Sequence, residues 1–330
     1  MSSMGQREFV ALLSGAASGW PLAAQAQQRS MPVIGFIYSA SPDPVAHRLR
    51  AFRQGLKEYD YVEGENCVIV YRWAESQNDR LAEMVADLTR REVSVITAMS
   101  TIAPVAAKAA NTTIPIIFQA AEDPVRLGLV ESLSRPGGNA TGVNFFIAEL
   151  TAKRLEFVRE LVPTAKRVGV LVDPHNTAGT ESTLQDAGPA ARAIGLQILV
   201  ANASTGREID AAFAIFVREQ IDALFIGPSG FLTSRRVHIT GQAMRHGIPA
   251  IYSQREFPEI GGLLSYGTNL SDTWRQIGVY AGRVLKGAKP ADLPVVQSTK
   301  FELVINLNTA RTLGLEIPAA LLARADEVIE

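Results

Sequence analysis

Along most of the chain, short and continuously apolar runs alternate with longer segments of helical periodicity. The first apolar run, Pro32–Tyr38, is rich in β-branched residues and predicts a buried strand. In the next segment, 44–59, the apolar residues Leu49, Phe52 and Leu56 recur at the spacing of one helix face. Strands without polar alternation are expected where helices cover both faces of a parallel sheet. The pattern therefore predicts an α/β protein.

This strand–helix alternation occurs twice. The first half predicts strands at 32–38, 67–71, 93–97, 114–118 and 140–146, and helices at 44–59, 80–91, 101–110 and 125–133. The second half predicts strands at 167–172, 196–200, 223–227, 249–253 and 262–267, and helices at 151–161, 183–194, 208–220 and 232–246. Ten strands in strict alternation with helices imply two doubly wound parallel sheets.

The last sixty residues are less regular. A helix is expected over 272–285, an extended segment over 295–307, and helices over 309–313 and 319–329. This tail is too short to form a third α/β domain. We therefore expect it to add to both existing domains, so that the chain crosses between them more than twice.

The first thirty residues have a different pattern. A short N-terminal segment that contains Arg7 precedes the apolar run Phe9–Ala17. The segment Ala24-Gln25-Ala26 follows and matches the A-x-A pattern of a cleavage site after Ala26. This layout is typical of a secretory signal peptide over residues 1–26, although a packed N-terminal helix is the alternative. A single arginine leaves the export route open, and the absence of a cysteine at the cleavage site argues against a lipid anchor. We expect an exported, soluble, periplasmic protein.

Composition excludes several function classes. The 330 residues carry a formal net charge of −1, so the chain lacks the basic field that nucleic-acid binding requires. The lone cysteine, Cys67, forms neither an internal disulfide nor a cysteine-based zinc cluster, and the four histidines lack metal-ligand spacing. Dinucleotide and P-loop motifs are absent, and Gly227–Gly230 does not match a nucleophile elbow. We expect no metal, no cofactor and no catalytic residues.

The remaining candidate chemistry lies in the loops that follow predicted strands. Ligands of open α/β sheets bind at the carboxyl ends of the strands, and these loops are rich in small hydroxyl-bearing residues and glycine. The residues that we expect to line a ligand site there are Ser39, Ser41, Ser100, Thr101, Asp173, Asn176, Ser229, Phe231, Tyr252 and Glu256. Ser100 and Thr101 precede an alanine-rich helix, whose N-terminal N–H groups favour an anion such as a carboxylate. The alternative is that one of the two only caps this helix.

The chain resembles the substrate-binding proteins of ABC uptake transporters, in the branch of the type I periplasmic-binding fold that includes tryptophan- and tyrosine-type binders. The resemblance covers essentially the whole chain and rests on several short segments taken together. They are 7–10 through 26–28, 33–36, 52–56, 71–74, 123–125 with 128–130, 135–139 with 141–142, 161–163, 262–267 and 300–306.

The resemblance implies two lobes, three crossover segments and a ligand cleft between the lobes. We place lobe boundaries at 31–146 plus 268–297 and at 147–267 plus 298–330, with crossovers near 144–149, 267–272 and 295–301. In related binders of amino acids, the loops after the third and fourth strands hold the ligand carboxylate. This implies the same role for Ser100, Thr101, Ala120 and Ala121 here.

The second lobe of such binders usually supplies an acid for the ligand ammonium group and side chains that cover the ligand. We expect Glu256 as the acid, with Phe231 and Tyr252 as the cover. Two loops depart from the family pattern: Met99–Ile102 lacks an expected glycine, and Gln119–Glu122 is unusual. Both departures bear on which ligand binds.

The expected function is therefore solute binding for an ABC uptake transporter. A monomer would trap an amino acid or a related carboxylate by hinge closure and deliver it to permease subunits in the inner membrane. One alternative is a two-domain enzyme that uses Asp173 and Glu256 as an acid/base pair. A transcription regulator would need a basic module before Val33, where the apolar leader lies instead.

Overall fold

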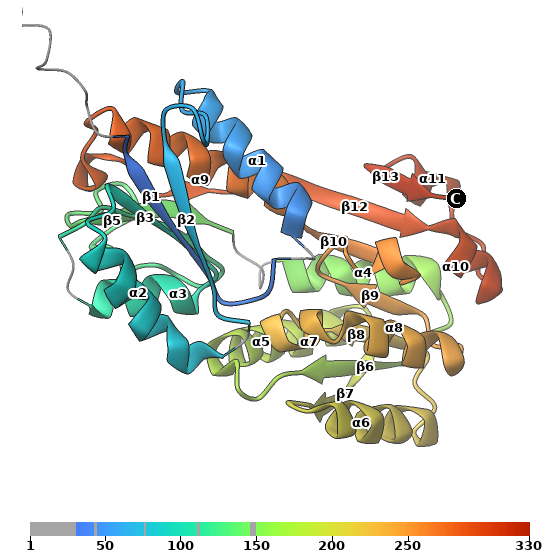
Figure 1. The fold of residues 1–330 in the computed structure, drawn as a ribbon. Coiled ribbons are helices and arrows are strands. Elements are labelled where there is room, and N and C mark those ends of the chain that lie inside the picture. Colours follow the sequence, from blue (N-terminus) through green and yellow to red (C-terminus); the bar gives the residue numbers. More distant parts are fainter. Residues whose placement is uncertain (1–30, 43–44, 76, 111–112, 146–149) are drawn as a thin grey trace, which may run out of the picture.

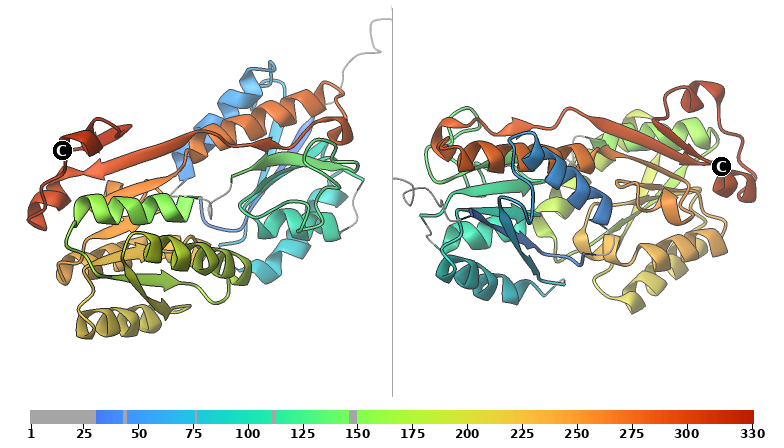
Figure 2. Two further views of the ribbon diagram at one scale, coloured as in Figure 1. Left: turned by 180° about the vertical axis from the view of Figure 1, so that it is seen from behind. Right: turned by 45° about the horizontal axis from the view of Figure 1, so that its top comes forward.

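The computed structural model describes residues 31–330 apart from residues 43–44, 76, 111–112 and 146–149. Over these residues the strands form two separate sheets, and helices pack on both faces of each sheet (Figure 1, Figure 2). The predicted α/β class with two doubly wound sheets is thereby confirmed. The predicted signal peptide, residues 1–26, lies outside the described residues.

The first sheet is parallel throughout, with the strand order β11–β5–β4–β3–β1–β2. Its strands are β1 Val33–Tyr38, β2 Val68–Trp73, β3 Val95–Met99, β4 Ile116–Ala120, β5 Ala140–Asn144 and β11 Val296–Gln297. The central strands β3, β4 and β5 are buried along their whole length. Their continuous burial accounts for the absence of polar alternation in their sequences.

The second sheet has the order β13–β12–β10–β9–β8–β6–β7. Its strands are β6 Arg167–Val172, β7 Gln197–Asn202, β8 Ala223–Ile226, β9 Ala250–Tyr252, β10 Leu264–Thr268, β12 Phe301–Asn306 and β13 Glu327–Ile329. Strands β6 to β10 are parallel as predicted, whereas β12 runs antiparallel to β10. The C-terminal tail therefore makes this sheet mixed at one edge.

Four helices sandwich the first sheet. On one face lie α1 (Ala46–Lys57) and α9 (Leu270–Leu285), and on the other lie α2 (Leu81–Arg90) and α3 (Ile102–Ala109). We call this sheet with these four helices lobe 1. Figure 2 shows α1 and α9 side by side, although more than two hundred residues separate them in the sequence.

The helices of the second sheet also form two layers. One layer contains α4 (Thr151–Leu161), α5 (Thr177–Ala193), α10 (Leu307–Thr312) and α11 (Ala319–Leu322). The other contains α6 (Gly206–Arg218), α7 (Gly230–Ser234) and α8 (Arg236–Arg245). We call this sheet with these helices lobe 2.

The chain passes between the lobes three times: from β5 to α4, from β10 to α9, and from β11 to β12. The backbone N–H of Asn269 donates to the carbonyl of Lys300 at 2.9 Å, so the second and third passages lie side by side. The first passage includes residues 146–149, which lie outside the described residues.

Helices α1 and α9 cross in close contact at two glycines. A Cβ atom on Gly55 would lie 1.9 Å from the carbonyl oxygen of Arg275, and one on Gly278 would lie 2.1 Å from that of Phe52. Only glycine permits this approach of two backbones. The crossing brings Trp274, which is fully buried, into the core of lobe 1.

Three predicted helices differ from the structure. Residues 125–133 form turns instead of a helix, because Gly128 adopts a φ of +69° that interrupts the helical ladder. The predicted helix 232–246 is two helices, broken at Arg235, whose ψ of 14° departs from helical geometry. The predicted helix 319–329 ends at Leu322, and β13 then pairs with β12.

Among the described residues, no helix combines the length and apolar character needed to cross a bilayer.

Candidate ligand-binding site

The carboxyl ends of the parallel strands of the two lobes point toward each other. In Figure 1, β1 and β2 run toward lobe 2, while β6 and β7 run toward lobe 1. Loops that follow strands in either lobe are therefore brought to the region between the lobes, where ligands of open α/β sheets bind. All of the predicted site residues lie at or just after such strand ends.

Ser100 has a strained backbone. It directly follows β3 and adopts a φ of +85°, in the left-handed region that favours glycine. Its hydroxyl oxygen is buried and has no hydrogen-bond partner in the described part of the chain. Neither Ser100 nor Thr101 caps α3 through its side chain. The capping alternative therefore does not account for these two residues.

The hydroxyl of Thr101 links the loops after β3 and β4. It donates to a carboxylate oxygen of Glu122 and accepts the backbone N–H of Ala121 at 3.2 Å. Ala120, also predicted to be in the site, is the fully buried last residue of β4. The side-chain amide of Asn144, at the end of β5, donates to the carbonyl of Glu122 at 2.7 Å. Three strand ends are thus held together by hydrogen bonds.

A second group of predicted residues meets in lobe 2. The Ser229 hydroxyl, after β8, donates to Oδ2 of Asp173, after β6, at 2.6 Å. Oδ1 of the same carboxylate accepts the backbone N–H of His175 at 3.0 Å. The Asn176 amide donates to the carbonyl of Pro228 at 3.0 Å, which ties the two loops together. The structure therefore brings Asp173, Asn176 and Ser229 into one polar cluster.

The two aromatic residues predicted to cover a ligand have different surroundings. Phe231 is half-buried near the start of α7, with the guanidinium of Arg235 5.8 Å from its ring centre. The ring of Tyr252 is 1% exposed and is stacked on Phe257, with ring centres 4.3 Å apart. Burial raises the pKa of the Tyr252 phenol. Tyr252 is thus a core residue of lobe 2 and is not placed to cover a ligand as expected.

Ser39 and Ser41 lie in the half-buried loop after β1. The preceding residue, Tyr38, packs edge-on against Trp73 and Trp274, with ring centres 5.9 and 5.5 Å away. Burial raises the pKa of Tyr38, while the guanidinium of Arg48 opposes the shift. Tyr38 at the end of β1 therefore lies between the aromatic side chains of lobe 1 and the guanidinium of Arg48.

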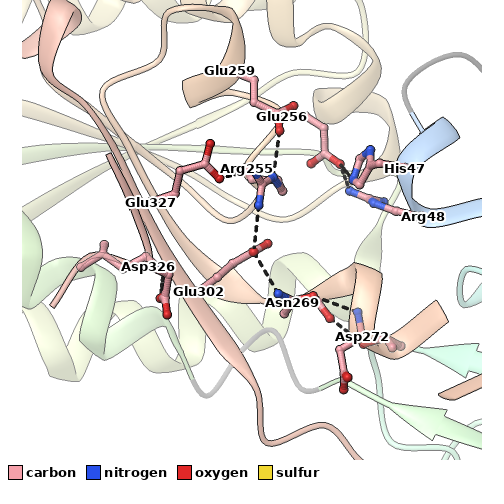
Figure 3. A network of polar contacts seen from close by, with 12 residues as sticks. His47, Arg48, Arg255, Glu256, Glu259, Asn269, Asp272, Glu302, Asp326 and Glu327 are labelled. Atoms are coloured by element: carbon pink, nitrogen blue, oxygen red, sulfur yellow. Dashed lines mark hydrogen bonds and ion pairs between the residues drawn. The ribbon is translucent and has the colours of Figure 1, made fainter. Parts of the chain in front are cut away.

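Glu256 joins the two lobes. It follows β9 in lobe 2, and its carboxylate accepts a hydrogen bond from the guanidinium of Arg48 on α1 of lobe 1 (Figure 3). Arg48 and Glu256 are 5% and 4% exposed. The His47 imidazole lies 3.6 Å from the same carboxylate, and burial together with Arg48 lowers its pKa. Glu256 was expected to bind a ligand ammonium group, and in this structure Arg48 takes that place.

Further ion pairs extend from this contact into lobe 2 (Figure 3). The guanidinium of Arg255 contacts the carboxylates of Glu259, Glu302 and Glu327. Burial raises the pKa of Glu302, while Arg255 opposes the shift. The Asn269 amide donates to Glu302 at 3.1 Å and thereby ties the network to the β10–α9 passage.

A hollow beside this network, lined by residues that include Arg48, Gln254 and Ser271, has essentially no room for a water molecule. Pockets for small molecules usually enclose about 300–1,000 Å³. We therefore do not assign the ligand site to this hollow. In the described part of the chain, no three His, Cys, Asp or Glu side chains are grouped so that they could hold a metal ion.

Sequence reasoning missed three residues of this region. Arg48 interrupts the apolar stripe of α1 between Val45 and Phe52, and a charge within such a stripe signals a buried partner. Asn144 occupies a strand end, which is a weaker signal. Glu122 lies in a loop already noted as unusual but was not itself predicted to be in the site.

The two lobes and their strand order define a two-lobed α/β protein with the type I periplasmic-binding fold. The family model described as "ABC transporter substrate binding protein" matches residues 33–329, and the chain belongs to this family. Its expected solute-binding role is thereby supported.

Particular relatives include the tyrosine-binding protein of Clostridioides difficile strain R20291. It is 29% identical over 269 residues, which is 81% of this chain and 76% of the relative. The ABC domain from Streptococcus pneumonia in complex with L-Trp has a TM-score of 0.82 at 25% identity, covering 91% of this chain and 100% of that one. The ligand-free, open structure of a substrate-binding protein from Clostridium difficile has a TM-score of 0.70 at 24% identity, covering 90% and 99%.

Proposed function

We propose that this protein binds a small molecule of the amino-acid class between its two lobes. One observation carries the proposal: the loops that carry these buried hydroxyl, amide and carboxylate groups follow strands of both lobes whose carboxyl ends run toward the same interlobe region. The relatives named for tyrosine and solved with L-Trp support this class of ligand.

Each lobe would supply part of the site. In lobe 1, the unpartnered Ser100 hydroxyl is available to a ligand. In lobe 2, Asp173 has no cationic partner among the described residues, so it is free to receive an ammonium group. Asn176, Ser229 and Phe231 would surround that group, and Ser39 and Ser41 would approach from the end of β1. Binding at about micromolar affinity corresponds to about −8 kcal/mol.

Binding would be coupled to closure of the lobes about the three passages. The higher TM-score to the L-Trp complex than to the open, ligand-free structure, at nearly equal identity, supports a closed arrangement here. The contact between Arg48 and Glu256 across the lobes supports the same interpretation.

The transporter context belongs to this proposal. An exported, periplasmic monomer would carry its ligand to the permease subunits of an ABC transporter in the inner membrane. The protein would perform no chemistry on the ligand. Its membership of the ABC transporter substrate-binding family supports the transporter context.

A thermal-shift screen tests the proposal, because a ligand that binds only the folded state raises Tm. The panel contains amino acids, the corresponding amines and organic acids. A saturable rise of several degrees with amino acids or their amines is expected, and a flat response of well-folded protein would contradict it. Asp173→Asn should reduce the shift strongly, whereas Asp186→Asn, an exposed change on α5, is the matched control and should leave it intact.

A further inference from the structure

Two of the donors predicted to hold a ligand carboxylate, the Thr101 hydroxyl and the Ala121 N–H, are already used within the protein. The Thr101 hydroxyl donates its proton to Glu122, and the Ala121 N–H donates to Thr101 Oγ1. A hydroxyl has a single proton to donate. A ligand carboxylate at this position would therefore have to displace the carboxylate of Glu122.

The carboxylate of Glu122 has no cationic partner among the described residues. No ion pair among the described residues involves Glu122, and its side chain is half-buried. Its backbone carbonyl accepts the hydrogen bond from Asn144, which fixes the loop. Two carboxylates in contact at a partly buried position repel each other. The loops after β3 and β4 therefore disfavour an anionic group.

Asn144 adds an unused acceptor at the same place. The residue is 0% exposed, and its amide nitrogen donates to the carbonyls of Ala120 and Glu122 at 3.1 and 2.7 Å. Its amide oxygen has no partner within the described residues. A buried acceptor without a donor is unfavourable, because it has lost its hydrogen bonds to water. A ligand group that donates a hydrogen bond to this oxygen should therefore bind more favourably than a group that only accepts hydrogen bonds.

Lobe 2 also contributes a carboxylate, that of Asp173. Asp173 is 7% exposed, and its carboxylate accepts from the Ser229 hydroxyl and the His175 backbone N–H. Each lobe thus contributes a carboxylate that lacks a cationic partner in the described structure.

From these contacts we infer that Glu122 determines ligand specificity, and that the ligand directs a positively charged donor, such as an ammonium or amidinium group, toward the loops after β3 and β4. The ligand is then an amine or an amino-acid derivative without a free carboxylate at this position. The inference rests on the proposed function and narrows its ligand class.

Matched ligand pairs that differ only in the carboxylate test this inference. Tryptamine is compared with L-tryptophan, and tyramine with L-tyrosine, by titration calorimetry on the full chain. Each amine should bind the native protein at least tenfold more tightly than its amino acid. Glu122→Gln removes the charge and should reduce this preference at least tenfold, whereas Glu122→Asp keeps the charge and should retain most of it.

Glu83→Gln, an exposed change of the same kind on α2, is the control and should leave the preference unchanged. Amino acids that bind the native protein as tightly as the amines would overturn the inference and leave the proposed function standing. A preference for amines that persists in Glu122→Gln would overturn the role of Glu122. Binding of neither amino acids nor amines would overturn the proposed function, and this inference with it.

Discussion

The guanidinium of Arg48 on α1 and the carboxylate of Glu256 after β9 form a buried ion pair across the two lobes. The two residues are 208 positions apart in the sequence. Nε of Arg48 and Oε2 of Glu256 have no hydrogen-bond partner in the described structure. The Coulombic attraction between the two charges therefore has to offset the free-energy cost of removing both of them from water.

Removing one member of this pair should be more damaging than removing both. Arg48→Met leaves the buried carboxylate of Glu256 without its cation and should cost about 3–5 kcal/mol of unfolding free energy. Adding Glu256→Gln to that variant removes the unpaired buried charge and should restore at least about 1 kcal/mol of the unfolding free energy. A double-mutant cycle by urea denaturation measures the coupling, and additive effects would show that the two side chains do not interact.

We expect the serine at position 100 to lower the stability of the fold and to strengthen ligand binding. Its left-handed φ costs a non-glycine residue roughly 1–2 kcal/mol, and its buried hydroxyl lacks a partner in the described structure. Ser100→Gly should therefore raise the unfolding free energy by about 1 kcal/mol after the greater unfolded-state entropy of glycine is subtracted. The same change should weaken ligand binding at least fivefold. An unchanged Kd, measured by calorimetry, would remove Ser100 from the site.

The lowered pKa of Asp272 predicts that the stability of the protein depends on pH. Burial raises its pKa, but hydrogen bonds from Lys300, Gln276 and Arg275 outweigh that effect and hold the pKa below the usual value of 3.8. Because the folded protein favours the charged form, the stabilisation is present above about pH 4 and is lost as the pH falls through the lower folded pKa.

The corresponding variant is Asp272→Asn. At pH 7 it should cost about 1.5 kcal/mol, and its difference in Tm from the native protein should shrink below pH 4. Asp292→Asn, an exposed change in the same part of the chain, is the control. A difference in Tm that stays constant from pH 7 to pH 2 would argue against a lowered pKa.

The crossing of α1 and α9 allows no side chain at Gly278. Its Cβ would meet backbone atoms of Phe52 and Leu56 at 2.1 and 2.9 Å, and backbone cannot move aside as a side chain can. Gly278→Ala should therefore destabilise the protein by about 2–3 kcal/mol despite the helix propensity of alanine. Gly241→Ala on α8, where a Cβ meets nothing within 4 Å, should be neutral or stabilising in the same thermal unfolding assay.

The periodic part of the sequence predicted most of the fold. Apolar runs such as Val95–Met99 lie between helices on both faces, so their composition reports directly on burial. The misassigned segments depend on contacts that periodicity does not encode. Residues 327–329 become a strand only because β12 offers them an edge, and Gly128 breaks a predicted helix by its φ value.

The site was predicted less well than the fold. Strand-end topology located Asp173, Asn176 and Ser229 together, because the carboxyl ends of neighbouring parallel strands share one edge. Residue type alone did not show that Glu256 pairs with a cation far away in the sequence, Arg48. Nor did it separate the core aromatic Tyr252 from a cleft residue.

The packing of α9 against α1 bears on how the polypeptide matures. Trp274 lies in one cluster with Phe36 and Phe52, so the interior of lobe 1 is closed by a helix that ends at Leu285. A growing chain cannot complete its N-terminal half until most of its C-terminal half has been synthesised. The usual order, in which an N-terminal domain folds before the next one follows, is therefore unavailable. The core of lobe 1 can be completed only after α9 has been synthesised, and a fragment that stops after β5 lacks the helix needed to cover that core.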